Sequence, residues 1–287
     1  MELWFTEKHT PHVKFSISVE RQLYSGYSEF QRIDIFDSRD FGRFLILDGK
    51  MMFTERDEFI YHEMISHVPM AVHPKVERIL VIGAGDGGVI RELIRYQSIK
   101  HIDLVELDPL VVKVCCEFLP FMACSLDDKR VHIHYQDGLK FVRNRENEYD
   151  IIIVDSTDPF GPGEDLFTRE FYGNCYKALK GDGILVNQLG SAFYDKDALA
   201  MQRAHKQVVN TFSLSRIYQA HVPTYPSGYW LWGFASKKYH PIKDLQDIKW
   251  QSLGIKTRYY TTKLHKGAFA LPAYVEEMLR DINTTLK

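Results

Sequence analysis

The segment over residues 149–164, YDIIIVDSTDPFGPGE, constrains the fold of this chain more than any other. Residues 151–154 are apolar and β-branched without interruption, which is typical of a strand covered on both faces in a parallel sheet. Ligands of open α/β sheets bind beyond the carboxyl ends of the strands. Asp155 and Asp158 follow the apolar run, so two carboxylates are expected at such a position. They indicate an amine, a sugar or a metal ion as the ligand.

Strand and helix patterns alternate along the chain after residue 75. Strands are predicted at residues 78–82, 102–106, 131–135, 150–154 and 183–188. Helices are predicted at residues 88–96, 109–119, 138–144, 169–179 and 195–209. This order predicts βαβ units around a parallel sheet. Residues 214–222 and 229–236 follow without a helix between them, which predicts an antiparallel hairpin at one sheet edge, and a closing helix is expected at 271–279.

The N-terminal part of the chain has a different pattern, that of β structure. Apolar and polar residues alternate over 14–19, and Asp48-Gly49 between two apolar runs is a strong hairpin signal. Apolar residues then recur at helical spacing, and we expect that helix to end near Pro69. The sequence therefore predicts an N-terminal β-strand domain over 1–54 and a Rossmann-like α/β domain with a mostly parallel sheet over 55–287.

Composition and charge exclude several classes of protein. The formal net charge is −2 and no basic block is present, which argues against nucleic acid as a partner. No apolar run approaches the ~18 residues that span a membrane, and MELWFTEKHT lacks the regions of a signal peptide. The 4 cysteines form no C-x-x-C pair, which fits reduced thiols. We therefore expect a cytoplasmic protein with neither a membrane nor a nucleic-acid partner.

A glycine-rich loop, VIGAGDGGVIREL, joins the first strand of the α/β region to its helix. It matches G-x-G-x-x-G at Gly83, Gly85 and Gly88, and Glu106 ends the next strand. Glycines let a backbone turn sharply beside a nucleoside, and the acid binds ribose hydroxyls. Asp86 within the loop would repel a pyrophosphate and attract a cation. These features favour a positively charged nucleoside, such as a sulfonium, over NAD.

Acidic residues stand at the ends of four successive strands, namely Asp86, Glu106, Asp137 and Asp155. Because the carboxyl ends of parallel strands meet at one edge of a sheet, we expect all four to face one cleft. Asp137-Gly138 by itself is more typical of a helix cap or a turn. In a nucleoside-binding domain, however, such an acid can accept a hydrogen bond from an adenine amino group.

Histidine spacing indicates no metal site. His62 and His67 form H-E-x-x-x-H, and five residues turn a helix by ~140°, so the two rings do not share one metal easily. His132 and His134 share a strand face but have no evident third ligand. We expect His62 to lie in the cleft and His67 to be structural.

These motifs resemble those of the spermidine synthases, the polyamine aminopropyltransferases. LDGKMMFTERDEFIYHEMISHVP, VIGAGDGGVIREL, VELDP, QDG, VDSTDPFGPGEDLF and PTYPSG occur in the family's order and spacing over nearly the whole chain. One departure is Ala84, where the family loop usually has a third consecutive glycine, and we expect no loss of function from it. The resemblance implies transfer of the aminopropyl group of decarboxylated S-adenosylmethionine, a co-substrate, to putrescine. The products would be spermidine and methylthioadenosine, and neither a cofactor nor a metal is implied.

The resemblance also implies roles for individual residues. Asp155 matches the family's proton acceptor. The nucleoside would contact Gln31, Glu106, Asp137, Gly138 and Pro162. The amine side would be lined by Tyr61, His62, Asp86, Asp155, Asp158 and Tyr225. The composition of residues 155–163, rich in glycine and proline, predicts a mobile gate, and the alternative is a rigid turn stiffened by proline. A homodimer or homotetramer is expected.

Other functions fit parts of the same pattern. An aminopropyltransferase with another acceptor, such as cadaverine, agmatine or spermidine, would share all of these motifs. Asp86 and Asp155 argue against a plain methyltransferase, whose cofactor tail carries a carboxylate, and Asp86 with the DSTDP segment argues against a nicotinamide-dependent dehydrogenase. Retention of Asp155, Tyr61 and Tyr225 argues against a binding protein that has lost catalysis.

Overall fold

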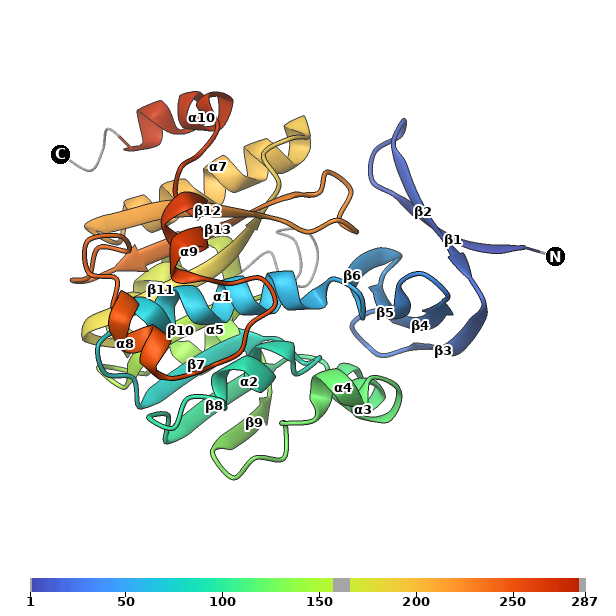
Figure 1. Cartoon of the computed structure of the whole chain (residues 1–287), viewed down its shortest axis with the longest axis horizontal. Helices are drawn as coiled ribbons and strands as arrows, with labels where there is room; N and C mark the ends of the chain where they lie inside the picture. The colour runs from blue at the N-terminus through green and yellow to red at the C-terminus, as the bar shows by residue number, and fades with distance from the viewer. Residues whose placement is uncertain (1, 157–165, 284–287) are drawn as a thin grey trace.

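The computed structural model describes residues 2–156 and 166–283. A β region from the N-terminal part of the chain, blue in Figure 1, lies beside a larger α/β region. The larger region holds a twisted, mostly parallel sheet with helices on both faces. The expected fold class, a Rossmann-like domain preceded by a small β domain, is confirmed.

The β region contains two antiparallel sheets. One is formed by β1 (Leu3–Lys8) and β2 (Lys14–Val19). The other is formed by β3 (Arg21–Tyr27), β4 (Arg32–Ser38), β5 (Gly42–Leu47) and β6 (Lys50–Thr54). The predicted turn at Asp48 and Gly49 joins β5 to β6, and both residues have a positive φ, 48° and 77°. Positive φ at two central residues is the geometry that favours glycine in tight hairpins.

A seven-stranded sheet in the order β12-β13-β11-β10-β7-β8-β9 forms the centre of the α/β region. Its parallel strands are β7 (Arg78–Gly83), β8 (His101–Glu106), β9 (Val131–Tyr135), β10 (Tyr149–Asp155) and β11 (Leu179–Gly190). The expected hairpin, β12 (Leu214–His221) and β13 (Tyr229–Ser236), pairs antiparallel at one edge.

Helices connect these strands and cover the sheet. The helices up to β11 are α1 (Glu58–Val72), α2 (Gly88–Leu93), α3 (Pro109–Phe118), α4 (Pro120–Ala123), α5 (Gly138–Val142) and α6 (Arg169–Ala178). Those after β11 are α7 (Asp195–Val209), α8 (Asp247–Ser252), α9 (Thr262–Ala268) and α10 (Ala273–Asn283). Neither α8 nor α9 is predicted by the sequence, because both are short and lack a clear apolar period.

Strand β10 is buried on both faces, as its unbroken apolar run predicts. Ile151 and Ile153 pack in the core cluster that includes residues of α1 and α2, whereas Ile152 and Val154 pack in the cluster that includes Phe171 of α6. Successive side chains of a strand point to opposite faces, so each face has its own set of partners. This packing fixes the end of β10, and with it Asp155, at the middle of the carboxyl edge of the sheet.

The prediction that the first helix ends near Pro69 is wrong. Helix α1 continues through Pro69 to Val72, and the N–H of His73 still donates to the carbonyl of Pro69 at 3.0 Å. A proline inside a helix removes one hydrogen bond and crowds the preceding turn. Here the last two turns of α1 are buried, and their packing outweighs that local cost.

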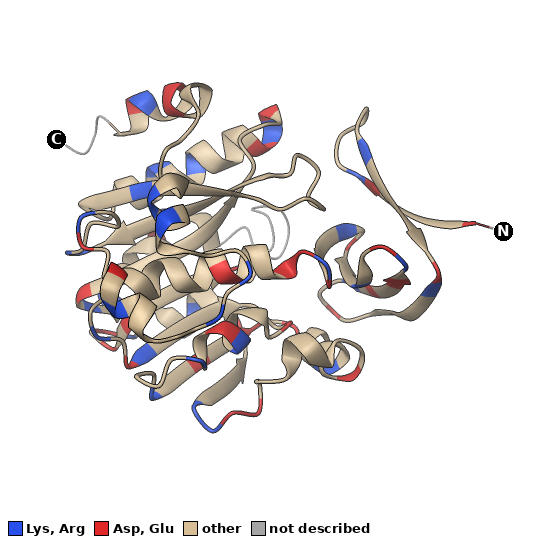
Figure 2. Cartoon of the chain, viewed as in Figure 1, with Lys and Arg blue, Asp and Glu red and all other residues tan. Residues whose placement is uncertain are grey.

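Charged residues of both signs are interspersed along the ribbon of both regions (Figure 2). This distribution fits the formal net charge of −2. Among the described residues, no helix combines the length and the apolar character that a membrane span requires.

Candidate active site

A cleft opens at the carboxyl edge of the parallel sheet, and the β region forms its opposite wall. Residues from the ends of β7, β8 and β10 line one side, and residues of β5 and β6 line the other. The sequence-predicted residues that line this one cleft are Gln31, Tyr61, His62, Asp86, Glu106, Asp137, Gly138, Asp155 and Tyr225. Asp158, Pro162 and most of the predicted gate lie outside the described residues.

The glycine loop brings the ends of β7 and β10 into direct contact. Gly83 has a φ of +83°, and a Cβ at this position would lie 2.0 Å from the carbonyl oxygen of Asp155. The N–H of Ala84 donates to that same oxygen at 3.1 Å. Ala84 also has a positive φ, 62°, so the residue that departs from the family pattern adopts a glycine-like conformation. The loop therefore carries Asp86 to the side of Asp155.

Glu106 is held by backbone donors beside the glycine loop, where it lines the cleft. Its carboxylate accepts from the N–H of Gly85 at 3.1 Å and from the N–H of Asp108 at 2.9 Å. Burial raises the pKa of Glu106 to about 7, and the charges of Asp108 and Asp86 also raise it. The two hydrogen bonds act in the opposite direction and lower the pKa. Such a carboxylate has oxygens in place to accept hydrogen bonds from a diol.

Gln31 reaches the same end of the cleft from the β region. Its amide nitrogen donates to Asp108 at 2.9 Å, and the hydroxyl of Ser28 donates to the same carboxylate oxygen at 2.7 Å. Asp108 thus links the β region to the end of β8, a role that was not predicted from its sequence. The sequence Asp108-Pro109 indicates only that Asp108 caps helix α3, which the structure also shows.

Asp137 and Gly138 lie at the start of α5. The Asp137 side chain accepts from the N–H of Lys140 at 3.1 Å and caps the helix, so the turn-and-cap interpretation of this pair is realised. Both residues also line the cleft, where a second oxygen of Asp137 can accept from a ligand.

At the other end of the cleft, the hydroxyl of Tyr61 donates to Oδ1 of Asp155 at 2.5 Å. Burial and the charge of Asp86 raise the pKa of Asp155 to about 6, while His62 and the Tyr61 hydrogen bond oppose the rise. Burial and the Asp155 charge raise the pKa of Tyr61 well above its ordinary value, so its hydroxyl stays a donor. Asp155 is therefore a base whose pKa lies unusually close to neutrality.

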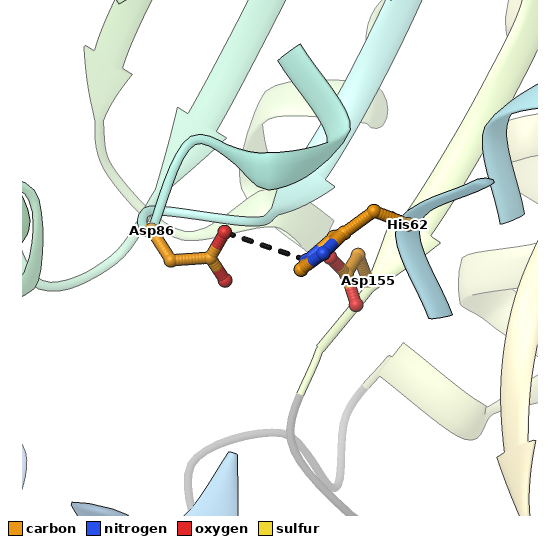
Figure 3. Close-up of side chains that lie close together, drawn as sticks. All are labelled: His62, Asp86 and Asp155. Carbon is orange, nitrogen blue, oxygen red and sulfur yellow. Dashed lines mark ion pairs between the residues drawn. The ribbon is translucent and has the colours of Figure 1, made fainter. Parts of the chain in front are cut away.

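His62 faces Asp86, and Asp155 lies beside the two side chains (Figure 3). Its Nε2 is 3.6 Å from Oδ1 of Asp86, and its Nδ1 is 2.8 Å from the carboxylate of Glu58. Burial lowers the pKa of His62, but the Glu58 hydrogen bond and the Asp86 charge outweigh burial and raise it overall. Glu58 is another contact that the sequence analysis missed, although its i, i+4 spacing from His62 on one helix was a usable signal.

The ligand atoms of His62, Asp86 and Asp155 all lie within 4.8 Å of one another. Three such groups can surround one small cation, either a metal ion or an ammonium group. Tyr225 borders the same space with its ring, 6.2 Å from the ring of Tyr61, while its hydroxyl donates to the carbonyl of Met52 at 2.7 Å.

The cleft extends further, toward the N-terminal hairpin. Glu7 is buried there and accepts from the N–H of Met51 at 2.9 Å and from the ammonium of Lys50 at 3.2 Å. His9 of the same hairpin region bonds Asp197 of α7 at 2.8 Å. The sequence offered no signal for this end, because the alternation of a surface hairpin does not reveal what covers it.

Two family descriptions match the chain. The spermine/spermidine synthase domain matches residues 58–247, and the spermidine synthase tetramerisation domain matches residues 3–55.

Known proteins match it over nearly its full length. A polyamine aminopropyltransferase of Alkaliphilus oremlandii is 65% identical and covers 97% of this chain and 98% of its own. One of Clostridium beijerinckii is 62% identical and covers 98% and 99%. The crystal structure of a spermidine synthase in complex with the transition state analogue AdoDATO has a TM-score of 0.95 and 42% identity, and covers 97% and 95%. That of the Thermotoga maritima spermidine synthase has a TM-score of 0.93 and 41% identity, and covers 97% and 94%.

Proposed function

The chain belongs to the spermine/spermidine synthase family, and we propose that it transfers an aminopropyl group to putrescine with Asp155 as the proton acceptor. The resemblance inferred from its motifs is confirmed, and the protein is a polyamine aminopropyltransferase, a transferase enzyme. The observation that carries the proposal is the group of Asp155, Asp86 and Tyr61 at one end of a cleft whose other end carries Glu106.

The aminopropyl donor would be decarboxylated S-adenosylmethionine, bound across the glycine loop. Glu106 would accept hydrogen bonds from the ribose hydroxyls, and Gln31 would contact the nucleoside from the β region. Asp137 and Gly138 would lie on the adenine side, where an acceptor oxygen meets the exocyclic amino group. Pro162, outside the described residues, is predicted to contact the nucleoside as well.

The acceptor amine would occupy the space between Asp86, Asp155 and His62, with Tyr61 and Tyr225 as walls. An alkylamine has a pKa near ~10 and arrives as an ammonium ion. Two carboxylates at this position stabilise that charge. Asp158 is predicted to hold an amino group too, and its position lies outside the described residues.

The reaction would be a direct displacement. Asp155 takes a proton from the ammonium, and the free amine nitrogen attacks the carbon next to the sulfonium. The carbon–sulfur bond breaks, its electron pair stays on sulfur, and a neutral thioether leaves. The leaving group needs no proton and no Lewis acid, so we propose a reaction without metal or cofactor. The raised pKa of Asp155, about 6, brings it closer to the pKa of the amine, which suits a general base.

The same acids would select the decarboxylated donor. Ordinary S-adenosylmethionine carries a carboxylate on the chain that would lie near Asp86 and Asp155, where like charges repel in a partly desolvated cleft. We expect the decarboxylated nucleoside to bind at least several-fold more tightly. Titration calorimetry with both nucleosides tests this, and equal affinities would contradict it.

Incubation with decarboxylated S-adenosylmethionine and a panel of putrescine, cadaverine, agmatine and spermidine tests the acceptor. We expect spermidine and methylthioadenosine, identified by mass, to form fastest with putrescine. Faster transfer to another amine would replace putrescine as the acceptor, and the absence of any transfer would refute the function. Asp155→Asn should still bind both substrates but turn over about 10²- to 10⁴-fold more slowly, so near-normal turnover would refute the role of Asp155.

The oligomeric state and the cellular location are proposed from the family match and from the sequence. The match of residues 3–55 to a tetramerisation domain supports a homodimer or homotetramer, which analytical ultracentrifugation would test. A cytoplasmic location stays a prediction from the cysteine pattern.

A further inference from the structure

Glu58 is a buried acid that the proposed reaction does not use. It is the first residue of α1, one helical turn before His62, and its relative exposure is 5%. Its carboxylate lies 2.8 Å from Nδ1 of His62 and also accepts two hydrogen bonds from the guanidinium of Arg91, at 3.1 and 2.8 Å. A buried carboxylate with this many donors holds one position.

The contact with Glu58 determines which nitrogen of His62 faces the substrate space. A carboxylate accepts hydrogen bonds, so the hydrogen of the ring is kept on Nδ1. The other nitrogen, Nε2, then points toward Asp86, 3.6 Å away, with Asp155 beside it (Figure 3). This is the arrangement by which a carboxylate orients a histidine in many catalytic and metal sites.

The His62 ring has close neighbours on two sides. A Cβ on Gly88 would lie 2.4 Å from Nε2 of His62, so the ring rests directly on the glycine backbone. On another side, the ring of Phe53 is 6.3 Å away in an edge orientation. The third glycine of the G-x-G-x-x-G motif thus makes room for His62.

We propose that Glu58 is a positioning residue for the transfer, acting through His62. It keeps the hydrogen on Nδ1, so that Nε2 accepts an N–H of the attacking amine. This inference rests on the proposed function and deepens it. The amine loses one proton to Asp155, donates a remaining N–H to Nε2 of His62, and so keeps its lone pair directed at the electrophilic carbon.

While no substrate is bound, burial lowers the pKa of the His62 ring, but the Glu58 hydrogen bond and the Asp86 charge raise it overall. Glu58 and Tyr61 face the ring from α1, Asp86 from the glycine loop, Arg91 from α2 and Asp155 from β10. An ammonium ion that enters between Asp86 and Asp155 brings a positive charge next to Nε2, which favours the neutral ring. A neutral ring with hydrogen on Nδ1 is an acceptor at Nε2.

A purely structural role is the competing explanation. Arg91 also pairs with Glu92, and Glu92 bonds His67 of α1, so Glu58 belongs to a buried network that joins α1 to α2. Loss of Glu58 would then weaken the helix contact and lower activity without any part played by His62.

A double-mutant cycle separates the two explanations. Wild type, Glu58→Gln, His62→Ala and the double variant are compared for kcat, for the KM of putrescine and for the Kd of putrescine with methylthioadenosine present. We expect Glu58→Gln to cost roughly tenfold or more in kcat, and to cost nearly nothing further in the His62→Ala background. An equal fold-loss in both backgrounds, or wild-type kcat in Glu58→Gln, would overturn the proposal.

Two further variants control for misfolding and for the loss of the contact with Arg91. If Glu58→Gln does not fold, Glu58→Asp takes its place in the cycle, because it keeps a charge beside Arg91 and draws the carboxylate away from the ring. Glu92→Gln removes the other carboxylate on Arg91 and should lower the Tm while kcat stays within about twofold. If wild type transfers the aminopropyl group to no amine, the proposed function fails. If wild type is active and the cycle shows equal losses in both backgrounds, only the role of Glu58 fails.

Discussion

The hydroxyl of Tyr61 and Oδ1 of Asp155 are 2.5 Å apart, which links helix α1 to the end of strand β10. Tyr61 is buried, and burial together with the Asp155 charge raises the pKa of its hydroxyl well above the ordinary value, so it stays a donor at neutral pH. Its hydrogen bond stabilises the ionised form of Asp155 and so opposes the effects of burial and of Asp86. The pKa of Asp155 thus depends on burial and Asp86, which raise it, and on His62 and the Tyr61 hydrogen bond, which lower it.

Tyr61→Phe should move the acidic limb of the rate profile to higher pH. The rate falls as Asp155 is protonated, and removal of the hydrogen bond raises the pKa of Asp155 further above 6. The profile of kcat/KM against pH measures this. Tyr218→Phe is the matched control, because its hydroxyl donates to the carbonyl of Met64 and not to Asp155. An unchanged limb, or one that moves to lower pH, would contradict the assignment.

Asp86→Asn should move the same limb in the opposite direction. The charge of Asp86 raises the pKa of Asp155, so its removal lowers that pKa and shifts the limb to lower pH. Asparagine can still accept the N–H of Gly88, which Asp86 accepts at 2.7 Å, so the loop should keep its shape. The KM for the amine should rise, since one carboxylate is lost. Asp127→Asn, at an exposed position, removes the same charge elsewhere and should change neither quantity.

Asp155→Asn should stabilise the protein at the expense of activity. A carboxyl whose pKa is raised on folding stabilises the folded state at low pH. This contribution is lost as the pH rises from the ordinary pKa of an aspartate through the raised pKa of about 6. At pH 8 the ionised side chain therefore opposes folding, and its replacement should raise the free energy of unfolding by about 1–3 kcal/mol. Urea unfolding at pH 8 and pH 5 measures it. The gain should shrink at pH 5, and a variant less stable than wild type at pH 8 would be inconsistent with this account.

Gly83→Ala should displace Asp155 and lower stability and kcat together. Its Cβ would lie 2.0 Å from the Asp155 carbonyl, and its φ of +83° is one that alanine rarely adopts. We expect a loss of at least about 2 kcal/mol. Gly173 offers the matched control, since it lies in α6 and a Cβ added there would have open space for 4 Å around it. Gly173→Ala should stabilise by up to about 1 kcal/mol. Thermal unfolding of both variants is the measurement, and a neutral Gly83→Ala would refute the close contact.

The α/β part of the fold was predictable because its signals are local. The run over 151–154 is buried on both faces as expected, and the hairpin of β12 and β13 closes one edge of the sheet. Predictions failed where packing overrides local preference. Pro69 lies inside α1 because the buried turns around it compensate for the hydrogen bond that a proline cannot make.

For the candidate site, the positions of the acids were predictable, but their contacts were not. Asp86, Glu106, Asp137 and Asp155 could be expected in one cleft, because the carboxyl ends of parallel strands meet at one edge and each of these acids ends a strand. Their contacts could not be predicted. Asp108 and Glu7 form hydrogen bonds with other elements, and nothing in the sequence around them indicates those partners. Glu58 is spaced i, i+4 from His62 on α1, which was a usable signal, but its contact with Arg91 of α2 was not predictable.

The sequence by itself therefore determined the fold class, the glycine loop, the family and the set of acids around the cleft, since each depends on residue spacing and on the fixed geometry of βαβ units. Only the tertiary structure decided how those acids behave. The 2.5 Å bond from Tyr61 to Asp155, the orientation of His62 by Glu58 and the raised pKa of Asp155 arise where α1, the glycine loop and β10 meet. Burial and charge depend on which groups are close together in space. The separation of these segments along the chain does not determine how close they come in the folded protein.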